Sequence, residues 1–132
     1  MSFLVDTNVL SELVRPRPNR HVDAWVRTQG HLDISAVTVE EIEFGLASRP
    51  SPRVQAWWSD FLADHCVVHA VDDRVARRAG QLRGQLQAAG IPRTQADMLI
   101  AATAAVRSAT LVTRNVADFA GCGIAVMDPF VG

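Results

Sequence analysis

The first carboxylate of the chain occupies a position from which acids can hold metals. Asp6 follows a short apolar run, Phe3 to Val5, and precedes a helical pattern. In an open α/β sheet, ligands bind beyond the carboxyl ends of the strands, and a carboxylate there can meet a divalent cation or the metal shell of a phosphate. Three further segments repeat this order of apolar run, polar turn and acid opening a helix, around Glu41, Asp97 and Asn115/Asp118.

Helix capping is the simpler explanation of each acid taken singly. The four-residue patterns that end at Glu41 and at Asp97 both begin with threonine and have the form of a capping box. Asp6 or Thr7 is a candidate cap of the first helix, and Asn115 or Asp118 is a candidate cap of a short helix near Phe119. Acids also favour helix N-termini because of the helix dipole. Capping does not explain why the four sites should come together.

Convergence follows from the expected topology. If the strands that end at Val5, Ser35 and Thr113 are parallel, the acids beyond them share one edge of the sheet, and a helix starting at Thr94 brings Asp97 to the same edge. Three or four carboxylates within a few ångströms would repel one another and raise their pKa values unless a cation neutralised them. Oxygen ligands without cysteine or histidine suit Mg²⁺ or Mn²⁺ and not zinc.

A sparse acidic pocket of this kind is the site expected for phosphodiester hydrolysis, because the metal lowers the pKa of an attacking water. Polar residues near the acids are candidates to orient metal waters or phosphate oxygens. They are Thr7, Asn8, Ser35 and Thr113. Arg114 lies at the same edge, where a guanidinium is suited to grip a phosphate through two hydrogen bonds.

The elements that must position these residues alternate along the chain. Strand-like segments are followed by helical stretches, which predicts an α/β fold with a short parallel sheet in one domain spanning residues 1–132. The expected strands are Phe3–Val5, Leu32–Ser35, Val67–Ala70, Thr110–Thr113 and Ile124–Val126. The first expected helix ends near Arg15, and the second covers Asn19–Gln29. A third begins at Thr38, and a fourth ends near Asp64. The last two cover Asp72–Ala89 and Thr94–Arg107.

The composition narrows the possible functions. The chain has 132 residues, 48% of them hydrophobic, and a formal net charge of −1, so nucleic-acid binding requires a local patch. All 13 basic residues are arginine, which excludes chemistry that needs a catalytic lysine. No segment has the length and hydrophobicity of a membrane helix. Cys66 and Cys122 match neither a zinc spacing nor a disulfide framework, and no signal peptide is present, so a cytoplasmic location is expected.

The four motifs together resemble those of PIN-domain ribonucleases, and in particular the VapC-type toxins of bacterial toxin-antitoxin pairs, including the FitB-like branch. The resemblance covers nearly the whole chain. It is carried by Asp6-Thr7-Asn8-Val9, by Ser35 to Ile42 with Gly45, by Ala96-Asp97 running into Ile100-Ala101-Ala102, and by Val112 to Asn115 with Asp118-Phe119.

This resemblance implies a PIN fold and an endoribonuclease that depends on Mg²⁺ or Mn²⁺. It also implies inhibition by a cognate VapB-like antitoxin, contact with DNA only through that antitoxin, and a homodimer. By motif position, Asp6, Glu41 and Asp97 take the acidic catalytic and metal-binding roles. Many PIN domains have an aspartate where this chain has Asn115, so either Asp118 supplies the missing carboxylate or Asn115 orients a water.

Two other classes of protein compete with this interpretation. Aspartate-nucleophile phosphatases and receiver domains also place acids at strand ends, but such sites use a lysine that this chain lacks. A catalytically weak or inactive PIN-fold binding module, acting mainly through an antitoxin and DNA complex, is the second alternative. The presence of Asp6, Glu41 and Asp97 together argues against it, whereas Asn115 leaves it open.

Two features suggest contact with a partner. The helix over Thr94–Arg107 is apolar nearly all round, which indicates either a fully buried position or a helix shared with another chain. Of the adjacent Trp57 and Trp58, one is expected in the core and the other facing outward.

Overall fold

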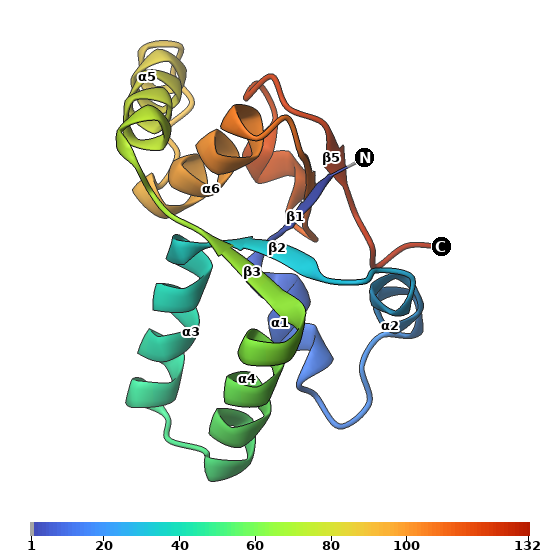
Figure 1. Ribbon diagram of the computed structural model, residues 1–132. Coiled ribbons are helices and arrows are strands. Elements are labelled where there is room, and N and C mark those ends of the chain that lie inside the picture. Colours follow the sequence, from blue (N-terminus) through green and yellow to red (C-terminus); the bar gives the residue numbers. More distant parts are fainter. Residues whose placement is uncertain (1) are drawn as a thin grey trace.

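A short parallel sheet forms the centre of the molecule in the computed structural model, which describes residues 2–132 (Figure 1). Its strand order is β3-β2-β1-β4-β5, and every neighbouring pair is parallel. The strands are β1 (Phe3–Val5), β2 (Leu32–Ser35), β3 (Cys66–His69), β4 (Thr110–Val112) and β5 (Val126–Met127). The α/β class and the parallel sheet expected from the sequence are therefore confirmed.

Helices cover both faces of this sheet (Figure 1). The helices are α1 (Thr7–Leu13), α2 (Arg20–Arg27), α3 (Ala36–Ser48), α4 (Pro52–His65), α5 (Asp73–Ala88) and α6 (Gln95–Val106), with a 3₁₀ turn η1 (Val116–Phe119). None of the helices in the described part of the chain is both long and apolar enough to cross a membrane.

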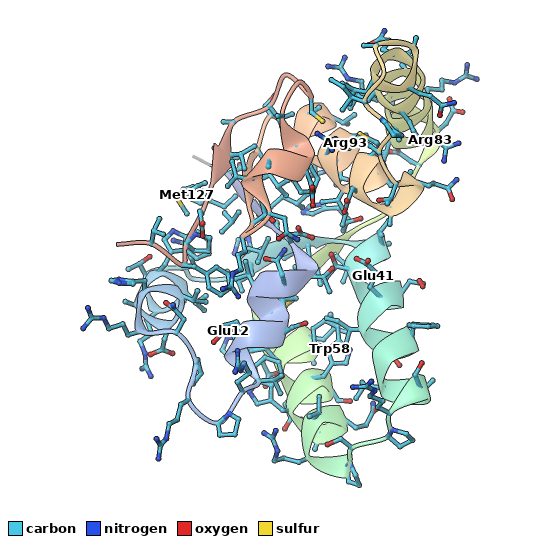
Figure 2. All side chains as sticks on the ribbon, turned by 180° about the vertical axis from the view of Figure 1, so that it is seen from behind. Glu12, Glu41, Trp58, Arg83, Arg93 and Met127 are labelled. Carbon is cyan, nitrogen blue, oxygen red and sulfur yellow. The ribbon has the colours of Figure 1, made fainter. Side chains whose placement is uncertain are left out.

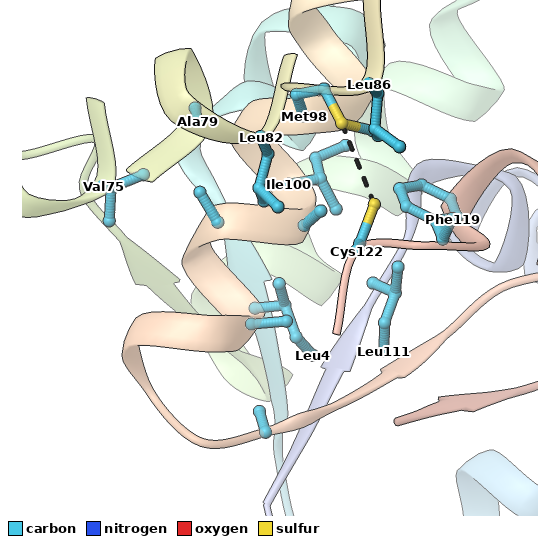
Figure 3. Packing of buried hydrophobic residues seen from close by; sticks show 14 residues of the cluster. Leu4, Val75, Ala79, Leu82, Leu86, Met98, Ile100, Leu111, Phe119 and Cys122 are labelled. Atoms are coloured by element: carbon cyan, nitrogen blue, oxygen red, sulfur yellow. Dashed lines mark hydrogen bonds between the residues drawn. The ribbon is translucent and has the colours of Figure 1, made fainter. Parts of the chain in front are cut away.

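The core has two parts, because the side chains along each strand point alternately to the two faces of the sheet. Leu4 and Leu111 point to a cluster built with α5 and α6, whereas Val5 and Val112 point to a cluster with α1, α2 and α4. Because successive side chains of a strand face opposite sides of the sheet, the two faces are packed at once. The sulfur of Cys122 lies 3.9 Å from that of Met98 in the first cluster (Figure 3).

Helix α6 is the most deeply buried helix next to the sheet. Met98, Ala101, Ala102 and Ala104 are fully inaccessible, and α6 packs mainly against α5. Of the two explanations for its apolar surface, burial inside the domain is the one observed. The helix therefore offers no support for a homodimer.

The start of α3 differs from the prediction. The helix begins at Ala36 and not at Thr38, because the hydroxyl of Ser35 accepts a hydrogen bond from the Val37 amide at 3.0 Å and so acts as the cap. Thr38 is buried inside the first turn. The capping box predicted to end at Glu41 is therefore wrong, and the Glu41 side chain is free to bond elsewhere.

Candidate active site

The candidate site lies where the sheet changes direction. After β1 the chain adds β2 and β3 on one side, and it returns to add β4 and β5 on the other. Ligands of open α/β sheets bind beyond the carboxyl ends of the strands at such a switch point. Asp6 follows β1 and Thr113 follows β4, so both lie at this point.

Asp6 is the N-cap of α1 and the centre of a hydrogen-bond network. Its Oδ1 accepts from the Thr7 amide at 2.8 Å, and its Oδ2 accepts from Thr113 Oγ1 at 2.8 Å and Asn8 Nδ2 at 3.0 Å. Three of its roughly four lone-pair sites are thus used, which leaves one acceptor position on Oδ1. Only 5% of the residue is exposed, and that position is the one suited to a single metal contact.

Thr113 and Asn8 hold Asp6 in place, and few of their hydrogen-bond donors and acceptors remain free. The Thr113 hydroxyl donates to Asp6 and accepts from Asn8 Nδ2 at 3.1 Å and from the Asn115 amide at 3.0 Å. Asn8 Oδ1 accepts from the Arg114 amide at 3.0 Å. Thr113 is fully buried, so its predicted contact with substrate is wrong, and its role is to orient the acid.

Glu41 enters the site from the second turn of α3. Thr7 Oγ1 donates to Glu41 Oε1 at 2.7 Å, and the hydroxyl oxygens of Thr7 and Thr38 are 3.1 Å apart. This contact joins α1 to α3 and fixes Glu41 beside Asp6. Thr7 was expected to contact a phosphate or a metal water, but its single proton is committed to Glu41.

Asp97 approaches from a third direction, in the first turn of α6. The helix cap is Thr94, whose hydroxyl accepts from the Asp97 amide at 3.1 Å. The bond from the Asp97 amide to Thr94, which is one half of the capping box predicted over Thr94–Asp97, is confirmed. The Asp97 carboxylate is half-buried and lies within electrostatic range of Asp118 and Arg93.

These acids surround one open cavity of about 450 Å³. Figure 2 shows Glu41 on α3 and Glu12 on α1, on neighbouring helices of this region. The lining residues come from α1 and the residues next to its ends, from α3 and α6, and from the segments after β4 and β5. They are Asp6, Thr7, Asn8, Ser11, Glu12, Arg15, Glu41, Asp97, Arg114, Asn115 and Phe130.

The pKa values of the three acids are raised. Burial is the main cause for each, and hydrogen bonds from Thr113, Thr7 and Thr94 lower the pKa values of Asp6, Glu41 and Asp97 in part. Repulsion adds to the effect: Asp97 raises the pKa of Asp6, and both raise that of Glu41. Each acid is therefore easier to ionise when a cation is beside it.

The donor set fits a hard, hydrated cation, but it is not a preformed three-ligand cage. Within residues 2–132 no three histidine, cysteine, aspartate or glutamate side chains are grouped closely enough to hold a metal ion. The expectation of three or four carboxylates within a few ångströms is wrong, because the acids rise from three separate elements around an open cavity. Mg²⁺ is commonly held by one or two carboxylates and keeps several waters, so the residues present suit it.

The remaining predicted residues divide into two groups. Asn115 lines the cavity, and its side chain does not cap η1. Asp118 is half-buried in η1 and does not line the cavity, although it raises the pKa of Asp97. Ser35 is fully buried as the cap of α3, so its predicted contact with substrate is wrong.

Four of the residues that line the cavity were not predicted from the sequence. Ser11, Glu12 and Arg15 follow Asn8 at helical spacing, and this periodicity was the available signal. Glu12 is occupied, since its Oε2 accepts from the Asn19 amide at 2.8 Å and its Oε1 pairs with Arg15 at 3.3 Å. No sequence signal marks Phe130, which reaches the cavity from the C-terminal segment.

An oxygen-lined acidic cavity at the switch point of a parallel sheet places the chain among α/β proteins whose site is built from carboxylates beyond the strand ends. Comparison with known proteins specifies the family. The PIN domain model matches residues 3–120, and the chain belongs to the PIN-domain family.

Several relatives are alike over the whole chain. VapC ribonuclease Y4jK of Sinorhizobium fredii is 33% identical, with 97% of each chain covered. The structure of FitAcB from Neisseria gonorrhoeae is 30% identical with a TM-score of 0.83, covering 98% of this chain and 99% of that one. DNA-bound VapBC from Salmonella typhimurium is 27% identical with a TM-score of 0.87, covering 98% of both. The resemblance to VapC and FitB toxins inferred from the motifs is confirmed.

Proposed function

We propose that this protein is a metal-dependent endoribonuclease and the toxin of a type II toxin-antitoxin pair. The observation that carries the proposal is the meeting of Asp6, Glu41 and Asp97 at one oxygen-lined cavity, each with a raised pKa. Membership of the PIN family and the names of the relatives, which include ribonucleases and a tRNA(fMet)-specific endonuclease, support the activity.

Asp6, Glu41 and Asp97 would hold Mg²⁺ or Mn²⁺, with Asn115 on the wall and Asp118 behind Asp97. The bound ion would supply an activated water and charge neutralisation at the phosphodiester. Asn8 and Thr113 orient Asp6, and Thr7 orients Glu41, so the acids keep fixed positions as charge develops. Arg114 on the cavity wall is the residue placed to bind a phosphate.

A cleavage assay tests this function directly. Purified protein is incubated with structured and single-stranded RNA in Mg²⁺, in Mn²⁺ and in EDTA. We expect cleavage only with metal, leaving a 3′-hydroxyl and a 5′-phosphate, because water is the nucleophile. Products that end in a 2′,3′-cyclic phosphate, or cleavage that survives EDTA, would contradict the mechanism. Absence of cleavage under every condition, with intact antitoxin binding, would favour the inactive binding module.

An apolar groove beside the acids is the proposed seat of the antitoxin tail. This groove of about 230 Å³ lies between α1, α3 and α4 and is lined by Leu10, Ile42, Leu46, Trp57 and Trp58, among others. Trp58 is buried and Trp57 is half-buried, so the expected division between the two is confirmed in part. The groove shares Thr7, Ser11 and Glu41 with the acidic cavity, so an apolar segment in it would deliver a basic side chain to the acids.

Several solved relatives are antitoxin complexes, and some include DNA, which supports an antitoxin partner with DNA reached only through it. Co-expression with the neighbouring small reading frame tests the pairing. Growth arrest should be relieved by that product, and Leu46→Asp should abolish relief while the toxin still folds. Relief that survives Leu46→Asp would place the antitoxin elsewhere.

A homodimer is proposed on a different surface from α6. Phe44 on α3 and Val67 and Val68 on the edge strand β3 are exposed by 70%, 42% and 44%, and α3 contacts β3. Large apolar side chains exposed to solvent favour association. Light scattering over a dilution series should give a dimer mass that Phe44→Ser converts to a monomer mass. A monomer in the wild type at micromolar concentration would refute the proposal.

A further inference from the structure

Arg114 and Phe130, which both line the cavity, contact each other. Arg114 Cζ lies 4.8 Å from the centre of the Phe130 ring, which is a cation–π arrangement. Phe130 is half-buried and packs on the second core cluster, whereas Arg114 is exposed. The ring therefore backs the guanidinium, and the other face of the guanidinium remains open to a ligand.

The backbone of Arg114 is tied to the catalytic acid. Its amide donates to Asn8 Oδ1 at 3.0 Å, and Asn8 Nδ2 donates to Asp6 Oδ2 at 3.0 Å. Two hydrogen bonds therefore fix the start of the Arg114 side chain relative to Asp6. A group stacked on Arg114 would lie next to whatever phosphate is bound at the acids.

The charge of Arg114 is not used inside the domain. Its guanidinium has no carboxylate partner within the residues that the structure describes, whereas Arg15 on the same cavity pairs with Glu12 at 3.3 Å. An unpaired guanidinium that contacts an aromatic ring is more ordered before a ligand arrives than a free one, so less entropy is lost on binding.

The cavity is open and measures about 450 Å³. Arg114 and Phe130 are among the residues that line it, so a group bound in the cavity can reach them.

We propose that Arg114 and Phe130 form a nucleobase subsite, in which the base next to the cleaved phosphodiester stacks on the open face of the Arg114 guanidinium. This inference rests on the proposed ribonuclease function. Unpaired bases stack on aromatic rings and on guanidinium planes, and such stacking tolerates any base. A phosphate grip alone requires only the charge of Arg114, whereas stacking requires its plane and the ring beneath it.

The test distinguishes stacking on the planar guanidinium of Arg114 from attraction to its positive charge. Fluorescence anisotropy measures binding of a fluorescein-labelled hexamer of riboadenylate and of an abasic chain with the same number of phosphates, in Ca²⁺ to keep the strands intact. Arg114→Lys keeps the charge and removes the plane, and Phe130→Leu keeps an apolar side chain and removes the ring. Arg83→Lys, on α5 away from the cavity, is the matched control (Figure 2).

We expect the wild type and Arg83→Lys to bind the hexamer roughly tenfold more tightly than the abasic chain. Arg114→Lys should remove most of this preference with little effect on the abasic chain, and Phe130→Leu should reduce it. Equal wild-type affinity for both chains, or an equal loss for both in Arg114→Lys, would overturn the subsite. If Phe130→Leu does not fold, Arg114→Lys still decides.

The outcome is separable from that of the cleavage assay. A protein that prefers the hexamer but cleaves no RNA in Mg²⁺ or Mn²⁺ would retain the subsite and lose the proposed function. A protein that cleaves RNA without preferring bases over abasic sites would retain the function and lose the subsite.

Discussion

Thr7 and Glu41 are joined by a hydrogen bond of 2.7 Å although 34 positions separate them in the chain. The donor lies in the first turn of α1 and the acceptor in the second turn of α3. This contact lowers the pKa of Glu41, in opposition to burial and to the charges of Asp6 and Asp97. One hydroxyl therefore links the packing of two helices to the charge of a carboxylate in the candidate site.

Removing that hydroxyl should affect both properties. Thr7→Val keeps the side-chain volume, removes the donor, and is expected to destabilise the fold by about 1 kcal/mol. The pKa of Glu41 should rise further, so the acid limb of the pH–rate profile should move to higher pH. Urea unfolding and kcat/KM as a function of pH measure the two effects. Thr7→Ser keeps a donor and should behave like the wild type; if it behaves like Thr7→Val, the hydroxyl is not the cause.

Metal binding should depend on the charge of Asp97. Asp97→Asn keeps the amide that Thr94 caps and removes one carboxylate, so calorimetry should show Mn²⁺ affinity reduced at least tenfold with helix α6 intact. Circular dichroism checks the fold. Asp118→Asn is the matched control because Asp118 does not line the cavity, and its effect should be smaller. Equal losses in the two variants would contradict the proposed set of ligands.

Stability without metal should increase on mild acidification. The pKa values of Asp6, Glu41 and Asp97 are higher in the folded protein than their ordinary values near 4. The folded state therefore binds more protons than the unfolded state above that pH, so the free energy of unfolding falls as pH rises through the raised pKa values. Thermal melting in EDTA should give a higher Tm at pH 5.5 than at pH 7.5.

Saturating Mg²⁺ should reduce or reverse this trend, because a cation favours the ionised acids. Asp97→Asn should flatten the pH dependence in EDTA. A Tm in EDTA that rises steadily from pH 5.5 to pH 7.5 in the wild type would show that the acids are not strained by burial and repulsion.

Ser35 should matter for folding and not for chemistry. Ser35→Ala removes the cap of α3 and is expected to cost about 1 kcal/mol of stability. KM for RNA should not change, because the hydroxyl is buried away from the cavity. Urea unfolding and steady-state kinetics measure the two quantities. A raised KM in a stably folded variant would restore the substrate contact expected from the sequence.

Asn115→Asp should add a carboxylate to the cavity wall. At low metal concentration, activity should increase, because a charged oxygen is a stronger ligand than an amide oxygen. Titration of the cleavage rate with Mg²⁺ measures the change. Equal or lower activity at every metal concentration would show that repulsion outweighs the added ligand.

The sequence predicted the elements that depend on local pattern. The alternation of apolar runs and helical stretches predicted the parallel sheet, and the position of Asp6 after β1 placed it at the edge of that sheet. The sequence pattern placed the start of α3 at Thr38 and not at Ala36. Ser35 and Thr38 are both good caps, and only tertiary contacts decide between them. The long-range partner of Glu41 and the arrival of Phe130 at the cavity depend on how distant segments pack, which no local pattern encodes.

The hydrogen bond between Asp6 and Thr113 spans 107 positions, and the amide of Arg114 meets Asn8 across 106. Most of the chain must therefore be synthesised before Thr113, whose hydroxyl donates to Asp6, is present. A nascent chain that ends before β4 offers Asp6 only its local partners Thr7 and Asn8, and β1 lacks its neighbour on that side. The hydrogen-bond network around Asp6 can therefore be completed only after β4 and the segment that follows it have been synthesised.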